Sequence, residues 1–173
     1  MPYEQGEEKY KRIIKTTENL KNEKRDSLVD EEMLKVVIFS LCDSLYAFYG
    51  DYTKSILPYD PITPVPGCPD YISGIINVRG DIESVISLHY FLGLAVRPVD
   101  GKTRIIIAET PELRSGILVN SVDDVIDIPL NSIAPPVATL DDRISSYVTG
   151  ELEYHDTIVT VLDVKKIFGR INI

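Results

Sequence analysis

The sequence has few of the residues that build metal sites or disulfide bonds. It contains two cysteines and two histidines among 173 residues. Cys42 and Cys68 form no C-x-x-C motif, and neither His89 nor His155 has the H-x-x-x-H or H-x-x-E-H partner of a metal site. We therefore expect no metal, no cofactor and no disulfide. The two thiols are predicted to be free and buried.

The sequence motifs of phosphate binding and nucleophilic catalysis are also absent. The chain has no G-x-G-x-x-G, no G-x-x-x-x-G-K-[ST] and no G-x-S-x-G segment. The adjacent carboxylates of Asp123-Asp124 and Asp141-Asp142 leave acid–base catalysis open. Neighbouring residues of a strand point to opposite faces, however, and in loops such pairs start turns or cap helices. The sequence therefore favours a protein that is not an enzyme.

Long hydrophobic runs and an excess of positive charge are missing too. No segment approaches the roughly 18 consecutive apolar residues of a transmembrane helix, and the N-terminus lacks the pattern of a signal peptide. With 18 Lys and Arg against 27 Asp and Glu, the formal charge is −9. Such a surface repels the phosphate backbone of nucleic acids. We expect a cytoplasmic protein without nucleic-acid partners or direct membrane insertion.

Residues 1–34 differ in composition from the rest of the chain. Residues 1 to 35 contain nine acidic and eight basic residues, and only a thin apolar stripe lies at helical spacing. This pattern predicts a charged, partly helical or flexible N-terminal extension, because isolated short helices are marginally stable. A helix that docks on a partner is the alternative. Residues 35–173 are predicted to form the folded domain.

Short runs rich in Val, Ile and Tyr follow Lys35 and predict an all-β fold with short helices. The prolines of residues 58–69 predict a surface connection, and Arg79-Gly80-Asp81 and His155-Asp156 predict tight hairpin turns. Two short helices are expected over residues 87–93 and 163–169, each ending at a left-handed glycine. The predicted strands are Val36–Leu41, Leu45–Tyr49, Ile75–Val78, Ile82–Leu88, Thr103–Ala108, Gly116–Val119, Val125–Ile128 and Thr157–Leu162.

An internal repeat relates two parts of this domain. Placing Gly74 over Gly150 gives a constant offset of 76 residues, and conservative pairs follow as far as Gly93 and Gly169. Each copy reads as glycine, strand, tight turn, strand, short helix and glycine. One copy has too few strands to close a barrel, so the repeat predicts two similar small barrels packed together.

Three segments resemble the signature of the CheW family of chemotaxis coupling proteins. Residues 71–80 read Y-I-S-G-I-I-N-V-R-G, and I-x-x-V-I-x-L-x-x-x-L-G follows over residues 82–93. Residues 116–125 read G-I-L-V-N-S-V-D-D-V. Opening strands and a closing segment extend the resemblance to about residues 35–170. The chain departs from the family at Ser84 and Ser87, where Pro and Asp are usual.

The resemblance implies two SH3-like, five-stranded β-barrels packed on a common core, with no catalysis. It also implies an adaptor that links the cytoplasmic tips of methyl-accepting chemotaxis receptors to the regulatory domain of the histidine kinase CheA, in arrays beneath the membrane. Receptor contact would lie in the groove between the barrels, and no kinase-contact residue is assigned. The matching receptor positions are Thr53, Ser55, Arg79, Val122 and Val125, and the structural turn and fold positions are Gly74, Asn77, Gly80 and Gly116.

Residue chemistry leaves the roles of these positions open. Arg79 is expected either to grip a receptor carboxylate or carbonyl, or to hold its own turn. Either valine is a candidate for the groove edge or for the core. At the level of function, the alternatives are an adaptor of the same fold in a non-chemotactic histidine-kinase pathway, a small-ligand sensor with a pocket between the barrels, and an enzyme that uses the acidic pairs.

Overall fold

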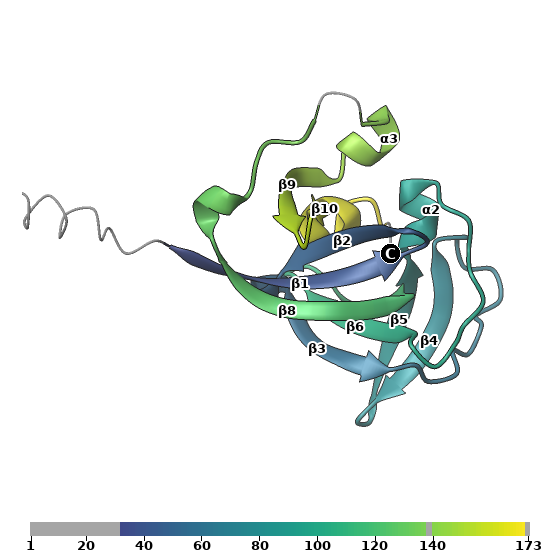
Figure 1. The fold of residues 1–173 in the computed structure, drawn as a ribbon. Helices are drawn as coiled ribbons and strands as arrows, with labels where there is room; N and C mark the ends of the chain where they lie inside the picture. The colour runs from purple at the N-terminus through teal and green to yellow at the C-terminus, as the bar shows by residue number, and fades with distance from the viewer. Residues whose placement is uncertain (1–31, 138–139, 172–173) are drawn as a thin grey trace, which may run out of the picture. The chain divides into compact units, whose positions relative to one another are not determined.

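The computed structural model describes residues 32–137 and 140–171. Almost all of the predicted N-terminal extension, residues 1–31, lies outside this described part. The described residues form mainly β-structure arranged in two five-stranded sheets, which confirms the all-β class (Figure 1). None of the described helices is long and apolar enough to cross a membrane.

The elements follow one another in two similar halves. The first half contains β1 (Met33–Leu41), β2 (Ser44–Tyr49), η1 (Gly50–Tyr52), β3 (Thr53–Pro58), β4 (Ile72–Val78), β5 (Asp81–Ser87) and α2 (Leu88–Leu92). The second half contains β6 (Arg104–Glu109), β7 (Arg114–Val119), β8 (Ser121–Pro129), η2 (Leu130–Ser132), α3 (Asp142–Ser145), β9 (Val148–Tyr154), β10 (Thr157–Leu162) and α4 (Val164–Phe168).

The two halves exchange strands between the sheets. The first sheet has the order β8-β1-β2-β10-β9, and the second has the order β3-β6-β7-β5-β4. Thus β1 and β2 of the first half share a sheet with β8, β9 and β10 of the second half and pair directly with β8 and β10. In the same way, β6 and β7 share a sheet with β3, β4 and β5 and pair directly with β3 and β5. The pairs β2–β10 and β5–β7 are parallel, and the other strand pairs are antiparallel. Each sheet therefore requires both halves of the chain.

Alternation along the strands distributes apolar side chains among three clusters. On β1, Val36 and Ile38 pack in a cluster of the first sheet, whereas Val37 and Phe39 pack in a central cluster. On β6, Ile105 packs in a cluster of the second sheet. The neighbouring Ile106 belongs to the same central cluster as Val37. The two sheets consequently share this central cluster, as expected for two units packed on a common core.

The internal repeat is present in the three-dimensional structure. Each copy has a hairpin with a register shift at the residue before its glycine, Ser73 before Gly74 and Thr149 before Gly150. Directly after each glycine, an isolated β-bridge joins the strand to a segment outside the sheet's named strands. The bridges are Thr63↔Ile75 and Ala134↔Glu151. These bridges connect β4 to the segment after β3, and β9 to the segment after β8. The 76-residue offset thus reflects a true structural repeat.

The two predicted helices exist as α2 and α4, but their ends differ from expectation. Gly93 ends α2 with φ 67°, in the left-handed conformation that was predicted. Gly169 instead has φ −64°, so the left-handed prediction is wrong there. The reason is that helical turns continue past it, since the N–H of Arg170 donates to the carbonyl of Ile167. The Asp163 carboxylate caps α4 by accepting from the amides of Lys165 and Lys166, whereas Ser87 makes no such bond at α2.

The prediction of buried thiols is wrong, although both cysteines are free as expected. Cys42 and Cys68 are partly exposed, because Cys42 occupies the β1–β2 turn at φ 55° and Cys68 lies in the proline-rich connection. Of the histidines, His155 is exposed in its turn, whereas His89 is buried in α2. Burial lowers the pKa of His89 below its usual value, because desolvation disfavours the charged ring.

Candidate functional site

Two of the predicted receptor residues lie on β8, an edge strand of the first sheet. Val122 pairs with Phe39 and Val125 pairs with Val37, both members of the central cluster. Directly paired residues of neighbouring strands point to the same face, so both valines point toward the space between the sheets. Val122 packs on the central cluster, whereas Val125 is 44% exposed. Val125 therefore presents apolar surface at the rim of this space.

On β3, the edge strand of the second sheet, the two predicted residues point in opposite directions. Thr53 pairs with Ala108 of the central cluster, whereas Ser55 pairs with Ile107 of the second-sheet cluster. A register shift at Lys54 separates the two pairs. Thr53 therefore faces the space between the sheets and Ser55 does not. The hydroxyl of Thr53 is buried without a hydrogen-bond partner among the described residues.

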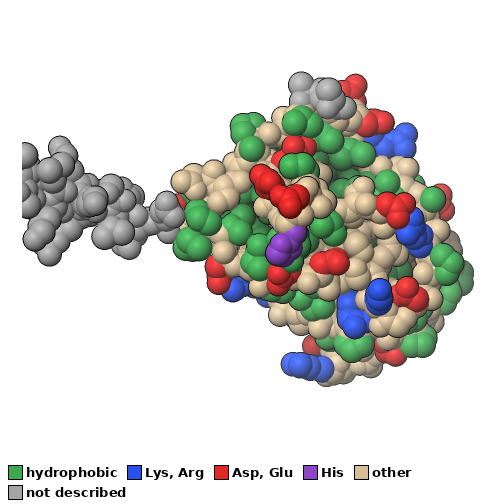
Figure 2. All heavy atoms as spheres, viewed as in Figure 1, with side chains coloured by type: hydrophobic (Ala, Val, Ile, Leu, Met, Phe, Trp, Pro, Cys, Tyr) green, Lys and Arg blue, Asp and Glu red, His purple; other side chains and the backbone are tan. Residues whose placement is uncertain are grey.

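Ile56 joins Thr53 on the same face of β3, because it pairs with Ile106 of the central cluster and packs against it. Sequence reasoning did not select Ile56, since the bulged Lys54 interrupts the alternation that marks a strand face. We call the set of Thr53, Ile56, Val122 and Val125 the inter-sheet face. On the side seen in Figure 2, apolar side chains are exposed among acidic ones over the region where β8 crosses in Figure 1.

Arg79 occupies a different part of the domain, the turn between β4 and β5. Arg79 and Gly80 have φ of 55° and 100°, and the N–H of Gly80 donates to Oδ1 of Asn77 at 2.8 Å. The Arg79 side chain is exposed and makes no hydrogen bond or ion pair within the described part of the chain. It lines a cavity of about 350 Å³ together with Leu57 and Pro58 from the end of β3. The structure does not bring Arg79 onto the inter-sheet face.

Two of the three predicted structural glycines, Gly74 and Gly116, lie where chain segments approach closely. Gly74 has φ 143°, and a Cβ at this position would collide with the backbone carbonyl of Thr63. Gly116 lies on β7, where a Cβ would come within 2.9 Å of the Ile105 side chain. Gly80 has open space around it but needs its positive φ for the hairpin turn.

Three of the four carboxylates of the acidic pairs, those of Asp123, Asp124 and Asp141, accept structural hydrogen bonds. Asp124 accepts from the hydroxyl of Tyr154 at 2.7 Å, and this hydrogen bond is the main reason that the pKa of Tyr154 is raised. Asp123 accepts from the Ser121 hydroxyl at 3.0 Å, and Asp141 caps α3 by accepting from the amide of Arg143. Within residues 32–137 and 140–171, no three His, Cys, Asp or Glu side chains gather as they would around a metal ion.

The chain resembles known proteins over nearly all of its described part. A family profile described as a CheW-like domain matches residues 35–172. The chemotaxis protein CheW of Thermotoga maritima is 28% identical over 148 residues, which cover 86% of this chain and 94% of that protein. The chemotaxis protein CheW of Bacillus subtilis is 28% identical over 138 residues, covering 79% of this chain and 87% of that protein.

A solved structure is similar in fold and in sequence. The scaffolding protein TtCheW from Thermoanaerobacter tengcongensis has 34% sequence identity and a TM-score of 0.68, and the match covers 77% of this chain and 86% of that one. The profile match begins within β1 and includes every later strand, so it takes in both sheets and the exchange of strands between them. The chain belongs to the CheW-like family of chemotaxis scaffold proteins.

Proposed function

We propose that this protein is a non-catalytic adaptor that couples transmembrane chemoreceptors to the chemotaxis histidine kinase CheA. Its relatives are chemotaxis proteins and a scaffolding protein, which supports a scaffold role rather than an enzymatic one. We place it in the cytoplasm, recruited to receptor arrays at the membrane. The receptor tip binds the inter-sheet face, and the regulatory domain of the kinase binds elsewhere on the domain.

The observation that carries this proposal is the exposed apolar rim of the inter-sheet face. Val125 is 44% exposed, although its paired partner Val37 is only 2% exposed. The apolar surface of the central cluster therefore continues to the solvent-exposed edge of the sheet at β8. Such an edge suits the apolar stripe of an amphipathic helix, the form expected of a coiled-coil receptor tip. Burial of Val125 under a helix would be worth about 1 to 2 kcal/mol.

The test is to replace Val125 with Asp and measure binding to a receptor-tip fragment and to the kinase regulatory domain. We expect receptor affinity to fall at least about tenfold, because a carboxylate would be buried at the contact. Kinase binding and melting temperature should stay unchanged. Ile158→Asp is the matched control, since Ile158 is 57% exposed on β10 of the same sheet. Equal receptor binding by both variants would contradict the assignment of this face.

Arg79 lies outside the inter-sheet face but lines a cavity with the end of β3, so it tests separately whether the receptor contact extends to the β4–β5 turn. The turn is already held by the hydrogen bond from Gly80 to Asn77, and the Arg79 side chain has no described partner. We expect Arg79→Ala to leave the melting temperature unchanged and to weaken receptor binding by about 1.5 to 3 kcal/mol, the worth of a hydrogen bond to a charged group. Kinase binding should survive.

The opposite pattern would identify a structural role for Arg79. If its side chain holds the turn, the melting temperature falls and both partners are lost together. Asn77→Ala serves as the reference for that outcome, because it removes the side chain that accepts from Gly80. Unchanged receptor affinity in Arg79→Ala would remove this residue from the contact.

A further inference from the structure

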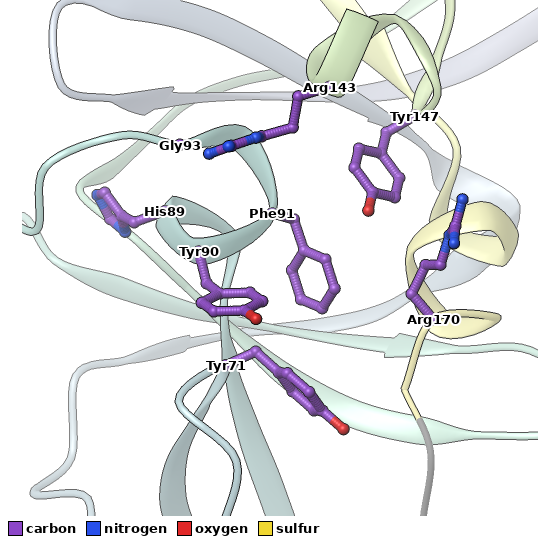
Figure 3. A pocket seen from close by; sticks show the side chains of 8 residues that line it. All are labelled: Tyr71, His89, Tyr90, Phe91, Gly93, Arg143, Tyr147 and Arg170. Carbon is purple, nitrogen blue, oxygen red and sulfur yellow. The ribbon is translucent and has the colours of Figure 1, made fainter.

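A cavity of about 650 Å³ lies beside α2, α3 and the segment after α4, away from the elements of the inter-sheet face. Its lining combines four aromatic side chains with two arginines: Tyr71, Tyr90, Phe91, Tyr147, Arg143 and Arg170 (Figure 3). The first three belong to the first half of the chain, and the others belong to the second half. We call this cavity the arginine cleft. None of these six residues was predicted from the sequence as a site residue.

The floor of the arginine cleft is a network of aromatic rings. The Phe91 ring lies 5.6 Å from Tyr71, 5.6 Å from Tyr90 and 5.8 Å from Tyr147, measured between ring centroids. Phe91 and Tyr147 are also members of the central cluster. These contacts hold the rings in place before anything binds, so little conformational entropy remains to be lost on binding. Tyr90 is 54% exposed and offers its ring to a ligand.

Arg143 and Arg170 have no described electrostatic partners. Three of the six arginines in the described part of the chain do have partners, because Arg97 and Arg114 form ion pairs and Arg104 donates to backbone carbonyls. Arg143 and Arg170 make no side-chain hydrogen bond or ion pair with described residues, in a chain whose net charge is −9. Both side chains are exposed. They flank Phe91 and Tyr147, and the Tyr147 hydroxyl points into the space between them (Figure 3).

This combination defines the chemistry of a ligand. A guanidinium group binds carboxylates through paired hydrogen bonds, and an aromatic floor accepts an apolar side chain. The overall negative charge disfavours nucleic acid. A small molecule needs most of its surface buried, whereas exposed Tyr90, Arg143 and Arg170 leave this cleft open to solvent. Exposed Tyr and Arg side chains of this kind are typical centres of protein–protein contacts.

We propose that the arginine cleft docks an acidic segment of a partner protein, with carboxylates on Arg143 and Arg170 and an aromatic or aliphatic side chain over Tyr90 and Phe91. This contact is separate from the proposed receptor contact, because it uses α2, α3 and the C-terminal segment instead of β3 and β8. The adaptor thereby gains a second binding site whose occupation does not compete with a helix on the inter-sheet face.

The experiment titrates the ¹⁵N-labelled full-length protein with the peptide acetyl-Glu-Glu-Phe-Glu-Glu-amide and follows backbone amides by NMR. We expect saturable shifts confined to the amides around Tyr90, Gly93, Tyr147 and Arg170. Arg143→Ala and Arg170→Ala should each weaken binding about tenfold, the loss expected for one charged hydrogen bond. Lys102→Ala removes the same charge from an exposed site outside the cleft and should leave the affinity unchanged.

Several outcomes would overturn the proposal. They are shifts scattered over the surface, arginine variants that bind the peptide as tightly as the unchanged protein does, and a peptide with Gln in place of each Glu that binds as tightly as the acidic peptide. Benzoate binding as tightly as the peptide would instead assign the cleft to a small organic anion. The melting temperature of each variant shows whether a loss of binding is caused by a loss of folding. Receptor binding by Arg143→Ala tests the inter-sheet face alone. A failure of the arginine-cleft proposal is therefore distinguishable from a failure of the proposed function.

Discussion

The two copies of the repeat share one register but stabilise it differently. The first copy, β4–β5 with α2, uses glycines at positive φ, namely 143° at Gly74, 100° at Gly80 and 67° at Gly93. In the second copy, β9–β10 with α4, none of the equivalent positions 150, 156 and 169 is a glycine at positive φ. It has instead a capping carboxylate, Asp163, at the position equivalent to Ser87.

The comparison shows that the two copies reach a similar hairpin and helix with different local features, since the turn of the first copy has Gly80 at positive φ whereas that of the second has His155 and Asp156 at φ 46° and 59°. A glycine at positive φ avoids the strain that a Cβ brings, but it costs more conformational entropy on folding. A cap such as Asp163 satisfies helix amides that otherwise lack partners. The first copy therefore depends more on glycines at positive φ, and the second has in addition the side-chain cap of Asp163.

The largest difference is expected between Gly74→Ala and Gly150→Ala. At Gly74 a methyl group meets the backbone of Thr63 at a φ of 143°, so strain and overpacking add to about 3 kcal/mol or more. At Gly150 a methyl group meets the Ile133 side chain and the Ala134 carbonyl without a positive φ, and we expect about 1 to 3 kcal/mol. Urea denaturation of each variant measures these losses.

Gly101→Ala is the control for both substitutions, since nothing lies within 4 Å of a Cβ at this position and its φ is not positive. Its denaturation midpoint should stay close to that of the unchanged protein. Equal midpoints for Gly74→Ala and Gly101→Ala would show that the first copy does not depend on its glycine.

The next effect is the loss of the cap on α4. Asp163→Ala removes the carboxylate that accepts from the amides of Lys165 and Lys166. We expect a loss of about 1 kcal/mol in the free energy of unfolding, the usual worth of an N-cap. Thermal unfolding at neutral pH measures it. Asp163→Asn should retain most of the stability, because an amide oxygen also accepts, and an equal loss in both variants would contradict the cap.

The smallest expected effect is a gain of stability from a new helix cap in the first copy. Ser87→Asp places at α2 the carboxylate that caps α4, and Ser87 currently makes no capping bond. We expect a gain of up to about 1 kcal/mol in the free energy of unfolding. The same substitution in an Asp163→Ala background should give the same gain, since the two helices are separate elements. A loss of stability would mean that the buried His89 side chain tolerates no charge beside it.

Short runs rich in Val and Ile made most strands predictable, including β1 and β6, which are buried on both faces. Interruptions of such runs explain the misses. β3 was not predicted because the sequence Thr53–Pro58 carries a bulge at Lys54 and ends in proline. β9 was implied only by the repeat, because Gly150 and two glutamates weaken its strand pattern. β8 begins four residues before the predicted strand, since a register shift at Asp123 breaks its alternation.

The candidate site was only partly accessible from the sequence. The family pattern selected Val122 and Val125, and the pairing of β8 with β1 explains why both share a face. The same pattern included Ser55, which the bulge turns to the other side of β3. The arginine cleft had no sequence signal at all, because Tyr90, Arg143 and Arg170 come from segments far apart in the chain.

The exchange of strands makes the whole domain one unit of folding. Leu45 of β2 pairs with Val159 of β10, so the first sheet cannot form until the chain has closed a very long loop. Loop closure of this kind slows folding and leaves early β-hairpins without a buried face. A fragment ending after α2 would lack β6 and β7, and would hold β3 without its neighbour. During synthesis the N-terminal half therefore keeps exposed strand edges until the C-terminal half has been synthesised and can pair with it.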